Sequence, residues 1–522
     1  MRLSFNTTGP CDPERHYMLP PEERLPDLLN YVDEQLYFVV HAARQTGKST
    51  AMIGFAKELR AAGKLAVYCS FENARVFDDV ASSEAIWLEA LVEAGRADLD
   101  PADRVPDEAP GVPKGARLHA ALSNWARVVA PRPLILLFDE VDVLATPPLV
   151  NLLGQLRAGF ATRGPGRFPT SVALIGMRDL KDYLTLAKDG VATNPGSPFN
   201  VKKASLTLRN FTHAEVSRLY AQHTAATGQE FTPEAVERVF YWTQGQPFLV
   251  NALAYQCVGR ARQYEDPRIE GTVTAEHIEE AKEKLILSRT THLDSLAYKL
   301  KEERVAPIIR ALLTGDEDVA QDSDDFQYVV DLGLIRRDRD GIVIANPLYR
   351  EVLARQLTVN TQGNVGPLWW RWSTPEGHLD MPALMREFQV WWRENADALK
   401  TRAPTGYTEA TAHIAFMGFL QRVVNGGGRV YREYGAGRGR IDILVEYGGR
   451  RDAIELKRIR TKDGPDAVRA KGITQLSQYL DQLGLTEGWL VLFDQRKRRS
   501  WDERIWTEDV EANGKTLHVI GA

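Results

Sequence analysis

Two short stretches of this chain combine a lysine with residues that handle phosphate groups or metal ions. In the first, an apolar run at 36–41 leads into Gly47-Lys48-Ser49, and a helical pattern follows directly. Glycine permits a close approach of the backbone, and the amides at a helix N-terminus attract phosphate oxygens. A lysine at this point reaches the β and γ phosphates, and the serine hydroxyl ligates Mg²⁺. The order strand, loop, helix therefore predicts a nucleoside triphosphate site.

The predicted phosphate-binding loop extends on both sides of these three residues. Its first position is an alanine, where such loops usually have a glycine. We expect the nucleotide to contact Ala42, Arg44, Gln45, Thr46, Gly47, Lys48, Ser49 and Thr50.

Two further apolar runs each end in residues that suit the same site. The run at 133–138 is typical of a central parallel strand and ends in Asp139-Glu140. The first of these acids is expected to steady Mg²⁺, and the second to activate the attacking water. The run at 171–176 is followed by Arg178, which can sense the γ phosphate. A surface salt bridge is a nearly equal interpretation of Arg178.

The other stretch, at 437–458, has one acid in a strand-like run and a second acid, with a lysine, in the next run. Asp442 and Glu455 are expected on adjacent strands, and Glu455 and Lys457, two residues apart, point to the same face. Two carboxylates that face one point can hold Mg²⁺ or Mn²⁺, and a lysine beside them can orient water and offset phosphate charge. The pattern suits phosphodiester hydrolysis, although ordinary salt bridges in a half-exposed sheet share this spacing.

The first half of the chain resembles the AAA-like ATPases near the STAND group, through "HAARQTGKST", "LILLFDEVD", "ALIGMRD" and "TQGQPFLV". This resemblance implies ATP and Mg²⁺ as ligands and a helical lid that follows the nucleotide fold. It also implies that Pro247, in the lid, approaches the nucleotide.

The C-terminal part resembles the PD-(D/E)XK nuclease superfamily, with Asp442 in its second motif and Glu455-x-Lys457 in its third. The resemblance implies a metal-dependent nuclease in which these three residues are catalytic. An isoleucine precedes Asp442, where the superfamily often has a proline.

Other parts of the superfamily pattern lie before and after these strands. Gln475 and Tyr479 match the Gln-x-x-x-Tyr helix motif of RecB-like members. The first-motif acid is expected to be Glu409, in the helix before the sheet, with Glu433 as the alternative.

The expected fold class is α/β and multidomain. A P-loop NTPase parallel sheet comes first, then a helical lid, a winged-helix-like module and a small α/β nuclease-like domain. The expected boundaries are 1–204 for the ATPase core, 205–295 for the lid, 296–360 for the winged-helix-like module, 361–405 for a linker and tryptophan-rich helical segment, and 406–522 for the nuclease-like domain. The winged helix can bind DNA and the tryptophans can stack on bases, but packing roles are favoured for both.

Length and composition limit the remaining possibilities. A chain of 522 residues exceeds one hydrophobic core, and its 44% apolar and 26% charged residues are ordinary for globular protein. The net charge of −5 is not that of a typical nucleic-acid binder, although residues 429–462 carry a local excess of Lys and Arg. Three scattered cysteines, the absence of a signal-peptide pattern and the absence of a long apolar run predict a cytoplasmic protein without a membrane span.

These observations together predict an ATP-binding and ATP-hydrolysing switch that controls a Mg²⁺- or Mn²⁺-dependent nuclease. The expected partner is nucleic acid, with DNA favoured, and a homo-oligomer is compatible with such a switch. Resemblance to STAND-related systems suggests defence against phage or plasmids. DNA repair, mobile-element processing and a non-cleaving ATP-dependent DNA-binding regulator are the alternatives.

Overall fold

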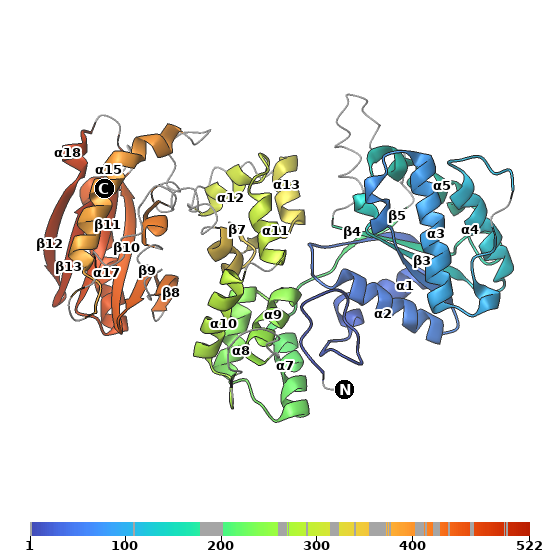
Figure 1. Ribbon diagram of the computed structural model, residues 1–522, viewed down its shortest axis with the longest axis horizontal. Coiled ribbons are helices and arrows are strands. Elements are labelled where there is room, and N and C mark those ends of the chain that lie inside the picture. The colour runs from blue at the N-terminus through green and yellow to red at the C-terminus, as the bar shows by residue number, and fades with distance from the viewer. Residues whose placement is uncertain are drawn as a thin grey trace. The chain divides into compact units, whose positions relative to one another are not determined.

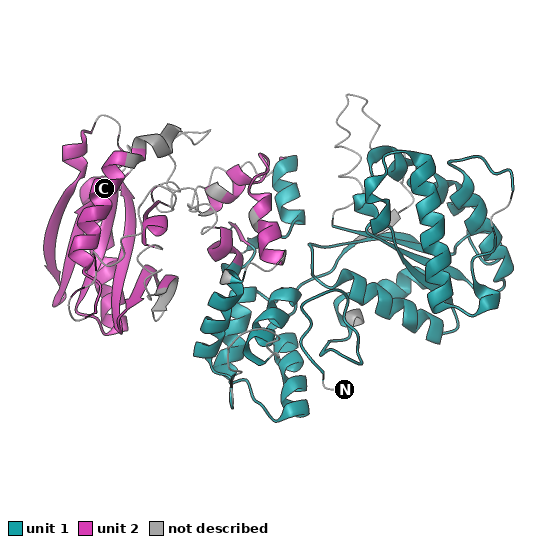
Figure 2. Cartoon of the chain, viewed as in Figure 1, with its two compact units in different colours: residues 1–290, 324–341, 345–348 teal, residues 291–323, 342–344, 349–522 magenta. Residues whose placement is uncertain are grey.

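In the computed structural model the chain forms two compact units, which Figure 2 shows in different colours. Unit 1 comprises residues 1–290, 324–341 and 345–348, and unit 2 comprises 291–323, 342–344 and 349–522. The structure describes residues 3–107, 110–177, 202–258, 269, 271–288, 291–313, 323–338, 341–353, 372, 374, 377–401, 412, 415–420, 429–436, 439–459, 464–494, 496 and 499–522. No helix in these described ranges is long and apolar enough to cross a membrane.

Unit 1 is built on a parallel five-stranded sheet in the order β2-β3-β4-β1-β5. Its strands are β1 (Tyr37–His41), β2 (Leu65–Ser70), β3 (Leu134–Asp139), β4 (Ser171–Gly176) and β5 (Lys202–Thr207). Its helices are α1 (Leu28–Asp33), α2 (Lys48–Ala61), α3 (Val80–Asp98), α4 (Arg117–Val128) and α5 (Thr146–Phe160), with short 3₁₀ helices η1 (Pro21–Arg24), η2 (Glu72–Val76), η3 (Pro101–Asp103) and η4 (Val141–Val143). Because parallel strands bury both faces, β3 and β4 are buried at every position.

Alternate residues of each strand supply two separate cores, one on each face of the sheet. Leu134, Leu136 and Phe138 of β3 pack against α3, α4 and α5. Ile135 and Leu137, which point the other way, pack against α1 and α2. Figure 1 shows the corresponding layers, with α3, α4 and α5 on one side of the sheet and α1 and α2 on the other. The sheet therefore has the two helical layers expected of a P-loop NTPase fold.

Among the described residues from 208 to 288 of unit 1, four helices follow β5. They are α7 (His213–Thr227), α8 (Pro233–Thr243), α9 (Pro247–Val258) and α10 (Ala275–Leu287). The Thr212–Glu215 capping box that begins α7 is present, and Thr232 caps α8. Residues 4–17 form an N-terminal strap that packs on α7. The centroid of the Phe5 ring lies 5.3 Å from the centroid of the Tyr220 ring.

The described residues between 291 and 344 form three helices and then two short strands. The helices are α11 (Thr291–Lys299), α12 (Ala306–Leu313) and α13 (Asp324–Asp331), and the strands β6 (Ile335–Asp338) and β7 (Gly341–Ile344) form a two-stranded sheet. The winged-helix-like module expected at 296–360 stays a prediction. The Arg336 guanidinium forms an ion pair with Asp338 at 2.8 Å and donates a hydrogen bond to the Gln244 side chain at 3.3 Å. Its hydrogen-bonding groups are therefore partly used by contacts within the protein.

Unit 2 contains a mixed six-stranded sheet in the order β12-β13-β11-β10-β9-β8. The strands of this sheet are β8 (Arg429–Ala436), β9 (Gly439–Tyr447), β10 (Arg450–Ile459), β11 (Glu487–Asp494), β12 (Trp506–Ala512) and β13 (Lys515–Gly521). In the same part of the chain lie the helices α15 (Met381–Thr401), α17 (Pro465–Leu483) and α18 (Trp501–Arg504). The β8–β9, β9–β10 and β12–β13 pairs are antiparallel, whereas β10–β11 and β11–β13 are parallel. The predicted strands of Asp442 and Glu455 are present as the adjacent strands β9 and β10, and the β12–β13 hairpin was not predicted.

Helices cover both faces of this sheet. Trp391 and Trp392 of α15, together with residues 412 and 415–420, pack on the face that includes Ile454 and Leu456. Leu476 and Leu480 of α17 pack on the opposite face. These two tryptophans therefore belong to the core of unit 2, while Trp369 and Trp370 lie outside the described residues.

Candidate functional site

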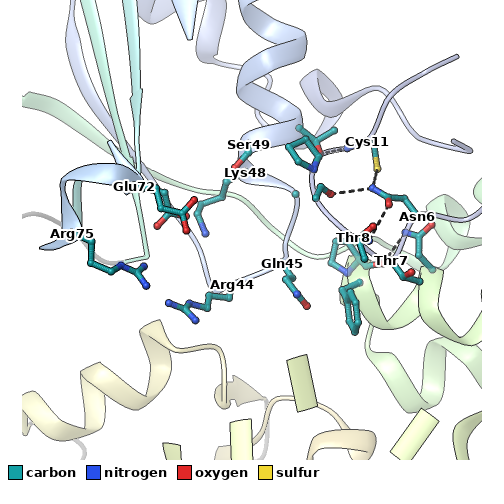
Figure 3. A pocket seen from close by; sticks show the side chains of 18 residues that line it. Asn6, Thr7, Thr8, Cys11, Arg44, Gln45, Lys48, Ser49, Glu72 and Arg75 are labelled. Atoms are coloured by element: carbon teal, nitrogen blue, oxygen red, sulfur yellow. Dashed lines mark hydrogen bonds between the residues drawn. The ribbon is translucent and has the colours of Figure 1, made fainter. Parts of the chain in front are cut away.

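Unit 1 has a cavity of about 470 Å³ at the start of α2, within the size range of small-molecule sites. Figure 3 shows Arg44, Lys48, Glu72 and Arg75 on one side of it and Asn6, Thr7, Thr8 and Cys11 on the other. The cavity therefore has a charged end and an uncharged polar end. Its lining residues are Asn6, Thr7, Thr8, Gly9, Pro10, Cys11, Arg44, Gln45, Gly47, Lys48, Ser49, Thr50, Glu72, Arg75, Glu140, Pro247, Phe248 and Asn251.

Lys48 begins α2 and is held against the loop that precedes it. Gly47 caps the helix with a φ of 89°, in the left-handed region that favours glycine. The Lys48 Nζ donates to the carbonyl oxygens of Ala42 at 2.7 Å and Ala43 at 3.0 Å. Burial lowers the pKa of Lys48, and the nearby Asp139, Asp142 and Glu140 oppose this effect. The result is an ammonium group, 8% exposed, at the wall of the cavity.

The Asp139 carboxylate lies at the end of β3 and joins three elements. Its Oδ2 accepts hydrogen bonds from the Ser49 hydroxyl at 2.7 Å and from the Tyr68 hydroxyl of β2 at 2.6 Å. Its Oδ1 accepts from the backbone amide of Glu140 at 2.8 Å. A serine hydroxyl and a carboxylate in contact are the oxygen donors that Mg²⁺ takes in phosphate-binding sites, so these residues fit that ion.

Glu140 lines the cavity next to this pair. Its φ of 57° lies in the left-handed region, which is unusual for a glutamate and is common at functional turns. Burial, followed by the charges of Asp142 and Asp139, raises the pKa of its carboxyl. A raised pKa brings a carboxylate closer to the proton affinity that a general base needs near neutral pH.

Two side chains that sequence reasoning did not select fix the loop from outside. The buried Arg24 donates from Nη2 to the Thr46 carbonyl at 2.9 Å and from Nε to the Arg209 carbonyl at 2.8 Å. Gln246, directly before α9, donates from its amide to the Gln45 carbonyl at 3.3 Å. The loop is therefore tied to the segment after β5 and to the start of α9.

The structure brings most of the predicted nucleotide residues to one place. Arg44, Gln45, Gly47, Lys48, Ser49, Thr50, Glu140 and Pro247 line the cavity. Ala42 and Asp139 lie beside it and contact Lys48 and Ser49 respectively, and the Thr46 hydroxyl donates to Ala43 O. Arg178 lies outside the described residues.

The second candidate site lies in unit 2, where β9 and β10 stop pairing. Their ladder runs from Arg450↔Tyr447 to Ile454↔Ile443. At the next position, the Asp442 Oδ2 accepts from the Leu456 amide at 2.8 Å, and the Asp442 amide donates weakly to Glu455 Oε2 at 3.5 Å. Side-chain carboxylates thus replace backbone partners where the strands diverge.

Glu455 and Lys457 lie on the face of β10 that α17 covers. The Lys457 Nζ donates to Glu455 Oε1 at 2.5 Å, and Glu455 is only 2% exposed. Gly472 of α17 lets the helix approach, since a Cβ there would lie 3.2 Å from Lys457 Cγ and 2.8 Å from Leu490 Cδ1. Burial and the charge of Asp442 raise the pKa of Glu455, and Lys457 acts in the opposite direction.

The structure describes some of the other residues predicted for the site in unit 2, but not all of them. Gln475 lies on α17, and its Oε1 is buried without a hydrogen-bond partner among the described residues. Tyr479 packs at the edge of the core between α17 and the sheet. Glu409 lies outside the described residues, and Glu433 belongs to β8. Among the side chains described, no three His, Cys, Asp or Glu residues are grouped to hold a metal. Asp442 and Glu455 still fit Mg²⁺, which usually takes one or two carboxylates plus substrate phosphate.

No protein-family model matches this chain, and no curated protein matches it. Among solved structures, it is similar to a Walker-type ATPase of Pyrococcus abyssi at 13% identity, over 67% of this chain and 99% of that one, with a TM-score of 0.48. It is also similar to the Thermotoga maritima RuvB Holliday junction branch migration motor at 14% identity, over 63% and 92%, with a TM-score of 0.33. Cdc6p of Pyrobaculum aerophilum has 13% identity over 66% and 95%, with a TM-score of 0.34.

Several residues of the first site were not selected from the sequence, because the patterns around them indicate a nucleotide site only weakly. The strap residues 6–11 are mostly turn formers, and they reach the cavity because the Cys11 amide donates to Thr50 Oγ1 at 3.0 Å. Tyr68 was detectable as a hydroxyl near the end of the apolar strand LAVYCS. Asn251 was detectable as a lone amide within the apolar helix PFLVNALAYQCV.

Proposed function

We propose that unit 1 binds ATP with Mg²⁺ and hydrolyses it. The observation that carries the proposal is the convergence of Lys48, Ser49 and Glu140 on one cavity, with Ser49 in contact with Asp139 at 2.7 Å. A parallel sheet with the loop after β1 and the acid at the end of β3 is the arrangement that such a site requires.

Each residue has a role that follows from its chemistry. Lys48 exchanges its two carbonyl acceptors for oxygens of the β and γ phosphates, and the loop amides bind the same oxygens. Ser49 and Asp139 would hold Mg²⁺, which supplies neutralisation of phosphate charge. Glu140 accepts a proton from the water that attacks the γ phosphate. Arg24 positions the loop through the Thr46 carbonyl.

Calorimetric titration with ATP and Mg²⁺ tests this proposal. Wild-type protein should bind, and Lys48→Ala should lose binding because the phosphates lose their buried cation. Lys57→Ala is the matched control, since Lys57 is an exposed residue of the same helix that does not line the cavity. Equal ATP affinity in wild type and Lys48→Ala would contradict the assignment.

We further propose that unit 2 is a metal-dependent nuclease, and a separate observation favours it. Asp442 and Glu455 meet where β9 and β10 diverge, and Lys457 contacts Glu455. Asp442 and Glu455 would hold Mg²⁺ or Mn²⁺, and Lys457 orients the attacking water and stabilises the charge on the phosphate. Gln475 and Tyr479 of α17 are proposed to complete the site, together with Glu409 or Glu433.

The two activities are proposed to form a switch in which the nucleotide state of unit 1 controls cleavage of DNA by unit 2, in a homo-oligomer or within one chain. Defence against phage or plasmids is the favoured setting, and DNA repair or mobile-element processing is the alternative. In that setting the protein acts in the cytoplasm.

Plasmid digestion with Mg²⁺ or Mn²⁺, with and without ATP, tests both the nuclease and the switch. Wild-type protein should cut, EDTA should stop it, and Asp442→Asn should abolish it. Asp481→Asn is the control, because Asp481 is an exposed acid of α17. Cleavage that survives EDTA would contradict the nuclease proposal. If Lys48→Ala protein cuts at the wild-type rate with and without ATP, the nuclease stands and the switch does not.

A further inference from the structure

We propose that Asn251 of α9 reads the 6-amino group of an adenine base, and so makes the cavity of unit 1 selective for adenine nucleotides. The inference rests on the proposed nucleotide binding and adds a specificity residue to it. Asn251 lines the cavity and is 7% exposed.

The orientation of the Asn251 side-chain amide is determined by a hydrogen bond to a backbone carbonyl of the same helix. Its Nδ2 donates to the Pro247 carbonyl at 2.8 Å, one helical turn earlier. The nitrogen is therefore on that side, and Oδ1 is the other group of the amide. This oxygen is buried and has no hydrogen-bond partner among the described residues.

A buried carbonyl oxygen without a partner is unfavourable, because it has lost its hydrogen bonds to water. Such an oxygen accepts hydrogen bonds and cannot donate them, so it requires a ligand with an N–H or O–H group. ATP carries these groups only on its base and its ribose, because its phosphates are acceptors when ionised. Asn251 therefore selects the nucleoside part of the ligand.

The surroundings of Asn251 favour the base over the ribose. Pro247 and Phe248, from the same helix, line the cavity, and Phe248 is half-buried. A proline and an aromatic ring offer apolar surface that suits a flat heterocycle better than a sugar rich in hydroxyl groups. The strap that lines the same cavity is uncharged from Asn6 to Cys11, so no cation there attracts phosphate.

Adenine and guanine differ at the atom that would meet Oδ1. Adenine presents an amino group there, which donates, whereas guanine presents a carbonyl oxygen. Two acceptors facing each other in a dry site repel, so the same oxygen that binds adenine rejects guanine.

Calorimetric titration of the wild-type protein with five triphosphates tests the inference. Purine riboside triphosphate, which lacks only the 6-amino group, should bind about tenfold more weakly than ATP. GTP should bind more weakly still, and 2′-deoxy-ATP and 3′-deoxy-ATP should match ATP within about twofold. Equal binding of ATP and purine riboside triphosphate would overturn the inference, and so would a tenfold loss with either deoxy-ATP.

Substitution of the asparagine then identifies the residue that discriminates. Asn251→Leu should bind ATP and purine riboside triphosphate equally, because the acceptor is gone, while Asn124→Leu on α4 should keep the wild-type ratio. If Asn251→Leu keeps that ratio, another group reads the base and the inference fails. The analogue series on wild-type protein decides the matter even if Asn251→Leu does not fold. Absence of binding by every triphosphate would instead overturn the proposed function of unit 1, and this inference with it.

Discussion

The two candidate sites both pair a lysine with acidic side chains, but they hold the lysine differently. Lys48 donates to two neutral carbonyl oxygens of its own loop. Lys457 donates to Glu455, a proposed metal ligand two residues away on the same strand. A phosphate that reaches Lys48 displaces uncharged acceptors, whereas one that reaches Lys457 competes with a carboxylate. The first lysine is thus suited to binding, and the second to a role beside bound metal.

The largest effect that tests this comparison is expected at Lys457. Lys457→Ala should lower the cleavage rate about 10²–10³-fold, because the charge on the phosphate under attack loses its electrostatic partner. Mn²⁺ affinity, measured by calorimetry, should change little, since an ammonium is not a metal ligand. A large loss of Mn²⁺ binding would show that Lys457 mainly organises Glu455, and the contrast with Lys48 would disappear.

A smaller effect is expected at Tyr68, which connects β2 to the acid of the first site. Tyr68→Phe removes the hydrogen bond to Asp139 Oδ2, which measures 2.6 Å. Loss of one such bond corresponds to about 1 kcal/mol, so Mg²⁺-dependent ATP affinity should fall about fivefold. Titrations with and without Mg²⁺ separate the effect of Tyr68 on the metal ligand Asp139 from its effect on the sheet. An equal loss without Mg²⁺ would mean that Tyr68 supports the sheet and not the metal ligand.

The smallest effect concerns Asp452, a buried acid of β10 on the face opposite Glu455. Burial raises its pKa to about 6, with Arg450 and His378 acting in the opposite direction. A carboxyl whose pKa is raised by folding stabilises the protein fully below pH 3.8, and this contribution is lost as the pH rises through 6. Asp452→Asn, which has no charge to bury, should therefore raise Tm by about 2–4 °C above pH 6.

Thermal unfolding across this pH range provides the check. The difference between Asp452→Asn and wild type should shrink toward pH 3.8, and DNA cleavage should be unchanged. A loss of cleavage would mean that both faces of β10 contribute to the site, which would remove the distinction between a buried acid and a functional one.

The sequence predicted the parts of each site that are contiguous or periodic. The loop from Ala42 to Ser49 was predictable because its geometry is local, and β9 and β10 were predictable from the alternation of apolar residues. The strap and Tyr68 were missed because their positions depend on contacts between distant segments, such as the Cys11 amide with Thr50. The β12–β13 hairpin had a usable signal in Asn513-Gly514, whose φ values of 52° and 69° suit a tight hairpin turn.

The strap also determines how the chain responds to thiol reagents. Cys69 and Cys257 are buried, and burial raises the pKa of each thiol to about 12, so neither is readily alkylated. Cys11 is half-buried and lies on the wall of the cavity. A maleimide dye should therefore attach at Cys11 first, without removal of the other two cysteines. The natural sequence thus provides an attachment point for an environment-sensitive fluorophore beside the cavity of unit 1.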